Sequence, residues 1–113
     1  MNNSDKKSYG VYVVYDDYME VMYIGSTGLS LDKLEYNHRN YDSLGYSSTD
    51  FRRALAVYGQ KWTFAWGLRP RMISREQIEI EEGALIRFVG PLYNKSMFPY
   101  ERSVHEGRFE RKL

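Results

Sequence analysis

The sequence predicts a small α+β domain: a β-β-α-α-β-α unit whose three-stranded, mainly antiparallel sheet is flanked by helices. Two segments rich in Val and Tyr, residues 9–15 and 21–24, flank a short polar loop and are typical of a β-hairpin. Amphipathic segments with capping residues follow, and a third alternating segment, KWTFAWGL at 61–68, lies between them. The chain has 113 residues, 42% of them hydrophobic, which suits one compact domain with a sizeable core.

The predicted hairpin brings two tyrosines together. Its loop, DDYM at 16–19, has four residues and uses Asp as the turn former. This loop length predicts a register in which Tyr12 faces Tyr23 and Val14 faces Val21. Directly opposed residues lie on one side of a sheet, so we expect the two phenol groups to be neighbours beside the two valines.

Two helices are expected next. Ser30 is a plausible N-cap for a helix over 31–41. A polar loop follows, and then a second helix over 51–58, which we expect Gly59 to close in the C′ position.

The third strand is expected to end at Leu68, before a loop formed by RPRMI at 69–73. Ser74 and Gln77 fit a capping box, which predicts the start of a last helix. Gly90-Pro91 is expected to end that helix after Val89. These boundaries predict a flexible N-terminus at 1–8, a single domain at 9–96 and a C-terminal arm at 97–113.

Composition excludes several classes of site. There is no cysteine, and therefore no disulfide framework or thiolate metal site. The two histidines, His38 and His105, make a zinc site improbable. No apolar run could span a membrane and no signal-peptide pattern is present, so we expect an intracellular, cytoplasmic protein. The net charge of +1 does not by itself indicate a nucleic-acid partner.

The last predicted helix carries a carboxylate on its apolar face. Ile78, Leu85, Ile86 and Val89 fall within one arc of the helical wheel, and Glu82 falls inside the same arc. A carboxylate that faces a core must be paired, hydrogen-bonded, metal-bound or protonated. Two interpretations remain open at this point. Glu82 is either a residue at the end of the stripe, which reaches out past smaller neighbours or pairs with an arginine, or it is a site residue.

The first predicted helix raises a similar question. His38 shares a face with Leu31 and Leu34, where a histidine is more often a half-buried packing residue than a catalyst. Lys33 falls on the opposite face and Arg39 on a flank.

Four segments in order resemble one family. GVY at 10–12 followed by YIG at 23–25 resembles the paired signature of the GIY-YIG nucleases, with Val in place of the first Ile. A helix with a histidine follows YIGSTG, and FRRALAVYGQKWTFAW at 51–66 is similar to the middle segment of the family's homing endonucleases. EGALI at 82–86 resembles the family's glutamate helix, and PLYN at 91–94 its asparagine motif. The resemblance covers about residues 9–96.

The resemblance implies a metal-dependent DNA endonuclease that hydrolyses phosphodiester bonds with one divalent ion, Mg²⁺ or Mn²⁺, per active site. Glu82 would be the metal ligand, and Mg²⁺ suits a single carboxylate because it keeps most of its water shell. Tyr12 would deprotonate or position the attacking water, which requires a nearby cation or metal to favour the phenolate. Tyr23 would hydrogen-bond at the phosphate, and His38 would orient the nucleophile or shuttle its proton. Asn94 would fix the surroundings of the glutamate or the last turn of backbone.

The sequence also departs from the family on the first predicted helix. The family has an arginine four residues before the histidine, and Leu34 stands there in this chain. If Lys33 is instead aligned with the arginine, Asn37 takes the place of the histidine, so either alignment loses one residue. The basic residues that we expect to contact DNA instead are Lys33, Arg39, Arg52 and Arg53. A wider basic path would add Arg69, Arg71, Arg75 and Lys95 if these residues cluster. The missing arginine keeps an alternative open: a catalytically inactive module of this fold that binds DNA or another protein. A homodimer, or a partner protein that supplies site choice, fits either interpretation.

Overall fold

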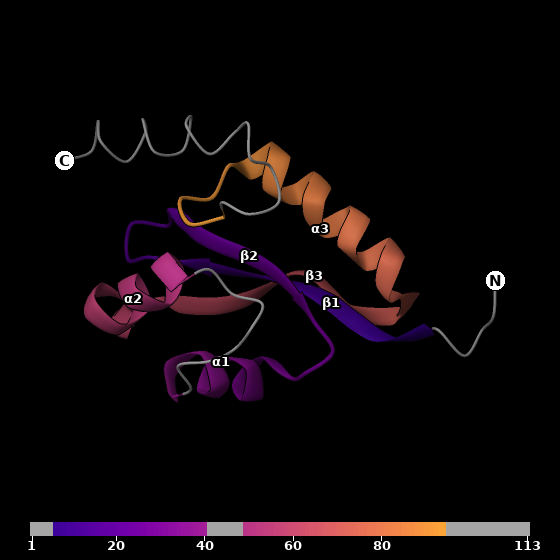
Figure 1. Ribbon diagram of the computed structural model, residues 1–113, viewed down its shortest axis with the longest axis horizontal. Coiled ribbons are helices and arrows are strands. Elements are labelled where there is room, and N and C mark those ends of the chain that lie inside the picture. Colours follow the sequence, from indigo (N-terminus) through magenta and orange to yellow (C-terminus); the bar gives the residue numbers. More distant parts are fainter. Residues whose placement is uncertain (1–5, 41–48, 95–113) are drawn as a thin grey trace.

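The computed structural model describes residues 6–40 and 49–94, and it has the predicted α+β architecture. Strands β1 (Lys6–Tyr15), β2 (Val21–Thr27) and β3 (Thr63–Ser74) form one sheet in the order β2-β1-β3, with both pairs antiparallel. The helices are α1 (Leu31–Asn40), α2 (Thr49–Tyr58) and α3 (Arg75–Val89), with a 3-10 turn, η2 (Gly59–Lys61), after α2. α3 covers one face of the sheet, and α1 and α2 lie on the other (Figure 1).

The sheet separates two apolar clusters, because alternate residues of its strands point to opposite faces. The cluster that faces α1 and α2 contains Tyr12, Val14, Tyr23, Leu34, Phe51, Leu55 and Phe64. The cluster that faces α3 contains Val11, Ile24, Ile73, Ile78 and Ile86. The central strand β1 contributes to both. None of the helices that the structure describes is long and apolar enough to cross a membrane.

Three of the predicted helix ends are confirmed. The Ser30 hydroxyl accepts a hydrogen bond from the Lys33 amide at 3.3 Å, at the start of α1. The Ser74 hydroxyl accepts from the Gln77 amide at 3.1 Å, at the start of α3. Gly90 ends α3 with φ 65°, the left-handed conformation that glycine adopts without steric cost.

The predicted role of Gly59 was wrong. This residue does not close α2 in a left-handed conformation but begins η2. A Cβ at this position would lie 2.7 Å from Leu55 Cδ1 and 2.9 Å from the Trp62 ring. Glycine is therefore required at position 59 by close packing.

The predicted register of the hairpin was also wrong, by two residues. Tyr12 pairs with Gly25, Val14 pairs with Tyr23, and an irregularity follows before Tyr15. A shift of two residues keeps the side-chain faces, so Tyr12 and Tyr23 are still neighbours, with ring centroids 6.2 Å apart. Val21 instead packs in the cluster under α3.

The turn and the irregularity beside it together explain the two-residue shift. The turn has five residues rather than four, and Met22 is an extra residue between the pairs Tyr15–Val21 and Val14–Tyr23. The Asp16 carboxylate accepts hydrogen bonds from the amides of Tyr18 and Glu20, each at 2.9 Å. Met19 takes a left-handed conformation with φ 64°. This turn leaves one more residue on the β2 side of the hairpin than the sequence predicts.

Two strands extend further than predicted. β1 begins at Lys6, which pairs with Ser74, so residues 6–8 are strand rather than a loose terminus. Residues 69–73 belong to β3 rather than to a loop. Pro70 lies beside a break in the β1–β3 register, and an edge strand tolerates a proline there. The predicted arm at 97–113 lies outside the described residues.

Candidate active site

A cleft of about 530 Å³ lies beside the edge strand β2. Four of the five side chains that the sequence suggests for catalysis line it: Tyr12 of β1, Tyr23 of β2, His38 of α1 and Glu82 of α3. The segment GSTG at 25–28, the end of β2 and the residue after it, also lines the cleft. Because these residues are small and lie at the sheet edge, side chains from both faces of the sheet reach the same cleft.

Tyr12 and His38 form a direct pair. The Tyr12 hydroxyl lies 3.1 Å from His38 Nε2, and both side chains are buried. The ring of Phe64 stacks near Tyr12 with centroids 6.2 Å apart, and Phe51 meets the His38 ring edge-on at 5.4 Å. Phe51 also stacks on Tyr23 with a centroid distance of 4.1 Å. Aromatic rings from α2 and β3 thus keep water away from the pair.

This burial sets the protonation of both groups. Loss of solvent, aided by the charge of Arg52, lowers the pKa of His38 to about 4, so the imidazole is neutral at pH 7. Its Nδ1 atom has no hydrogen-bond partner among the described residues. Burial first, and then Tyr23 and Glu82, raise the pKa of Tyr12 well above its usual value. Tyr12 therefore keeps its proton in the protein alone, and only a cation bound nearby could favour the phenolate.

Glu82 reaches the cleft from the opposite face of the sheet. It is half-buried, and burial is the main cause that raises the pKa of its carboxyl; Glu79 acts in the same direction. Hydrogen bonds from the side chain and backbone of Ser26 act against this rise. No ion pair to Glu82 occurs within the described residues, so the arginine-paired alternative is not what the structure shows. The charge of Glu82 acts on Tyr12, which indicates that the two groups lie near each other.

The donor set at Glu82 suits a hydrated divalent ion. Within residues 6–40 and 49–94, no three His, Asp or Glu side chains come together as a closed metal cage. Glu82 offers one carboxylate beside the Ser26 hydroxyl, in a cleft open to solvent. Mg²⁺ binds in this way, through one or two carboxylates, several waters and the oxygens of a phosphate. A closed zinc site would need more protein ligands than this cleft provides.

Asn94, the fifth predicted residue, does not line the cleft. Its side chain accepts a hydrogen bond from the Ile24 amide at 2.8 Å and donates one to the Ile24 carbonyl at 2.7 Å. The Tyr93 amide adds a bond to the Met22 carbonyl at 2.9 Å. The segment after α3 therefore lies along the outer edge of β2 and holds the strand that carries Tyr23.

Only the structure explains why a glycine is needed at position 25. A Cβ there would lie 2.5 Å from the Tyr12 hydroxyl and 2.6 Å from its Cζ atom. The tyrosine ring lies directly over this glycine, which is its partner across the strands.

We predict that Gly25→Ala displaces Tyr12 and breaks its hydrogen bond to His38. The overpacking should cost about 1–3 kcal/mol of folding free energy, measured by urea denaturation. Gly28→Ala is the matched control, because its Cβ would meet Tyr9 at an ordinary 3.4 Å. Equal stability of the two variants would contradict this packing.

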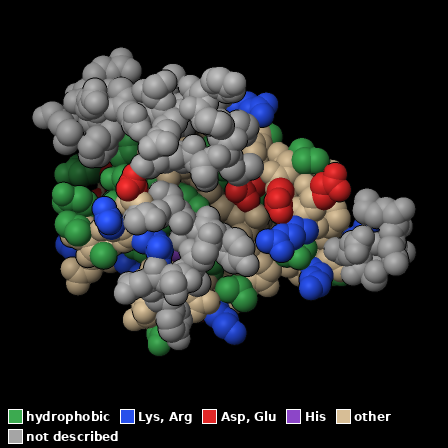
Figure 2. All heavy atoms as spheres, in the orientation of Figure 1, with side chains coloured by type: hydrophobic (Ala, Val, Ile, Leu, Met, Phe, Trp, Pro, Cys, Tyr) green, Lys and Arg blue, Asp and Glu red, His purple; other side chains and the backbone are tan. Residues whose placement is uncertain are grey.

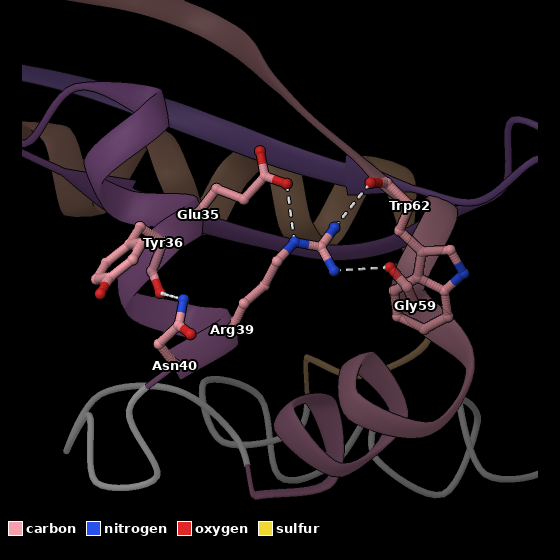
Figure 3. Close-up of polar contacts among 6 residues, drawn as sticks. All are labelled: Glu35, Tyr36, Arg39, Asn40, Gly59 and Trp62. Atoms are coloured by element: carbon pink, nitrogen blue, oxygen red, sulfur yellow. Dashed lines mark hydrogen bonds and ion pairs between the residues drawn. The ribbon is translucent and has the colours of Figure 1, made fainter.

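Arg39 has a different role from the predicted DNA contact (Figure 3). Its guanidinium donates from Nε to Glu35 at 2.8 Å, from Nη1 to the Gly59 carbonyl at 2.9 Å and from Nη2 to the Trp62 carbonyl at 3.0 Å. It also lies 5.6 Å from the ring centroid of Phe64. Arg39 therefore ties the last turn of α1 to the start of β3, one residue from His38.

We predict that Arg39→Met loosens α1 and exposes His38. Loss of these charge-assisted bonds should cost about 2–3 kcal/mol of stability. The pKa of His38, followed by NMR of its ring protons, should move up from about 4 toward the ordinary value. Arg39→Lys should recover only part of both effects, because lysine lacks the planar fork. If His38 has the same pKa in Arg39→Met as in the wild type, Arg39 does not have this role in holding α1.

The other residues that were predicted to contact DNA differ in their exposure and in whether they line the cleft. Lys33 and Arg53 are exposed and do not line the cleft. Arg52 is half-buried and close enough for its charge to act on His38. Among the described arginines and lysines, Arg75 of α3 alone lines the cleft, and the sequence offered it only as one member of the wider path.

Two members of the wider path are held in ion pairs, and Lys95 lies outside the described residues. Arg71 pairs with Glu81, and Arg75 pairs with Glu79 at 3.2 Å. In the face shown in Figure 2, acidic side chains gather over α3 and the basic side chains stand in separate groups.

Comparison of the chain with protein families, characterised proteins and solved structures found no match. The candidate site therefore stands on its geometry and on the resemblance of its motifs.

Proposed function

We propose that this protein is a metal-dependent DNA endonuclease of the GIY-YIG type that hydrolyses phosphodiester bonds. The observation that carries the proposal is the convergence of Tyr12, Tyr23, His38 and Glu82 on one cleft. These residues are far apart in sequence and come from four different elements. Packing alone would not require two tyrosines, a neutral histidine and a half-buried carboxylate to line one cleft.

The pair formed by Tyr12 and His38 supplies the proton-transfer part of the proposal. His38 is neutral at pH 7, and its Nε2 atom is within hydrogen-bond reach of the Tyr12 hydroxyl. Tyr12 can pass its proton to His38 as it takes one from the attacking water, so no free phenolate has to exist beforehand. Burial makes His38 a weak base in the free protein, and the negative charge of a bound phosphate would raise its proton affinity for this step. Tyr23, stacked on Phe51, holds its ring fixed beside this pair and can hydrogen-bond a phosphate oxygen.

Glu82 supplies the electrostatic part. A Mg²⁺ or Mn²⁺ ion bound there would neutralise charge on the scissile phosphate and the leaving oxygen. Burial disfavours the negative charge of Glu82, and a cation relieves that cost. DNA is the partner that this activity requires. We also propose that the protein acts in the cytoplasm.

Supercoiled plasmid tests this proposal. The purified protein is incubated with Mg²⁺, with Mn²⁺ and with EDTA, alongside Glu82→Ala and the exposed control Glu76→Ala. Relaxed or linear product that needs metal, is made by Glu76→Ala and is absent with Glu82→Ala would support the nuclease and the ligand together.

One observation favours a second candidate, an inactive module that binds DNA. Arg39 is bound within the fold, and α1 places no arginine in the cleft. A missing charge-stabilising group of this kind can cost about 10²–10³ in rate. Protein that shifts DNA on a gel but yields no product in either metal, including from DNA of the source genome, would favour this candidate.

A further inference from the structure

The cleft extends beyond the predicted catalytic residues along α3. Arg75, Ile78, Glu79 and Glu82 all line it, at spacings of three or four residues that place them on one face of the helix. The apolar Ile78 is fully buried between the charged positions. The wall of the cleft thus presents a carboxylate at one end and a guanidinium at the other.

Arg75 is too far along the helix to act on the phosphate at Glu82. Seven residues of α-helix span about 10 Å, which exceeds the reach of one phosphate group. The side chain of Arg75 is 66% exposed, and its pairing with Glu79 uses Nε at 3.2 Å. An exposed pair of this kind contributes little stability, so a phosphate can replace Glu79 at low cost.

We infer that Arg75 forms a second phosphate subsite, which binds an uncleaved phosphate of the same DNA strand on the α3 N-terminal side of the scissile bond. This inference rests on the proposed function and adds to it the direction of the bound strand. Arg75 acts in substrate binding, whereas Glu82 acts at the scissile phosphate. Glu79 competes with the DNA for Arg75 and repels the backbone.

The two side chains of this ion pair should therefore have opposite effects on affinity. Arg75→Gln should weaken binding of a duplex roughly fivefold and reduce the salt dependence of log K by about 0.9, the value for one phosphate contact. Glu79→Gln should tighten binding, roughly twofold or more, because it frees Arg75 and removes a negative charge. If the ion pair had only a structural role, the two variants would either both bind the duplex more weakly or both bind it with wild-type affinity.

The test uses fluorescence anisotropy of a labelled duplex of about two helical turns, titrated with full-length protein in EDTA at several salt concentrations. Arg87→Gln, an exposed arginine of the same helix outside the cleft, is the matched control. Weaker binding by Arg75→Gln than by Arg87→Gln, together with tighter binding by Glu79→Gln, is the expected result. If Arg75→Gln matches Arg87→Gln in affinity and salt slope, the subsite is wrong and the nuclease proposal stands. If the wild type binds no duplex at low salt, the nuclease proposal fails and the subsite with it.

Discussion

Tyr12→Phe is expected to lower the rate of DNA cleavage by about 10²–10⁴, the usual contribution of a positioned proton-transfer group. The substitution removes only the hydroxyl that lies 3.1 Å from His38 Nε2. The ring, which fills the space over Gly25 and beside Phe64, stays in place. Folding stability should fall by only about 1 kcal/mol, because one buried hydrogen bond is lost.

The measurement is single-turnover cleavage of a labelled duplex at saturating protein. Tyr58→Phe is the control, since Tyr58 is 72% exposed and lies outside the cleft. A Tyr12→Phe enzyme that cuts at the wild-type rate would remove Tyr12 from the chemistry. A general loss of affinity without a loss of rate would assign it to binding instead.

Acid is expected to destabilise the fold by about 3 kcal/mol between pH 7 and pH 4 through His38 alone. Burial holds the pKa of His38 at about 4 in the folded protein, against 6.5 in an unfolded chain. The unfolded chain therefore binds the proton first as pH falls below 6.5, and stability is lost across the window from 6.5 to 4. Above pH 6.5 neither state binds this proton, so the effect is absent.

Urea denaturation at each pH, followed by the fluorescence of Trp62 and Trp66, measures this loss. His38→Leu shares every other titrating group with the wild type, so the difference between their pH profiles isolates the histidine. The wild type should lose about 3 kcal/mol more than His38→Leu on going from pH 7 to pH 4. Parallel profiles would show that His38 is not buried in its neutral form.

The helix ends could be predicted from the sequence because capping is local. Ser30, Ser74 and Gly90 each act on amides or carbonyls within one turn, and the structure confirms all three. The prediction for Gly59 relied on the same local rule and was wrong. A glycine after a helix usually indicates a left-handed cap, whereas this one begins a 3-10 turn and packs against the side chains of Leu55 and Trp62.

The strands were harder to predict where tertiary pairing overrides local preference. Pro70 and its arginine neighbours are typical of a loop, but β3 is an edge strand and can include a proline. The hairpin register depended on a five-residue turn with Met19 in a left-handed conformation and on the irregularity between Val14 and Tyr15, and no local preference indicates either. The two-residue shift changed the partner of Tyr12 but kept it on the face of Tyr23.

The candidate site shows which of its features a sequence pattern can predict and which it cannot. The anomalous Glu82 on an apolar stripe correctly indicated a side chain with an uncommon environment. The pattern could not reveal Ser26 as its partner, because Ser26 comes from another element. It also could not show that Arg39 is bound within the fold, since its acceptors are backbone carbonyls of Gly59 and Trp62.

The central claim is that Glu82 and Tyr12 serve one reaction from opposite faces of the sheet. Measuring DNA affinity and cleavage rate separately tests it most directly. Wild type, Tyr12→Phe and Glu82→Gln are each titrated with a labelled duplex in EDTA, and Mg²⁺ is then added at saturation. The account predicts that Tyr12→Phe binds the duplex with wild-type affinity and that Glu82→Gln binds it at least as tightly, because a negative charge is removed from the cleft. Only the wild type should cut the duplex at an appreciable rate. Cleavage at the wild-type rate by Glu82→Gln, or by any of the three while EDTA is present, would contradict the account.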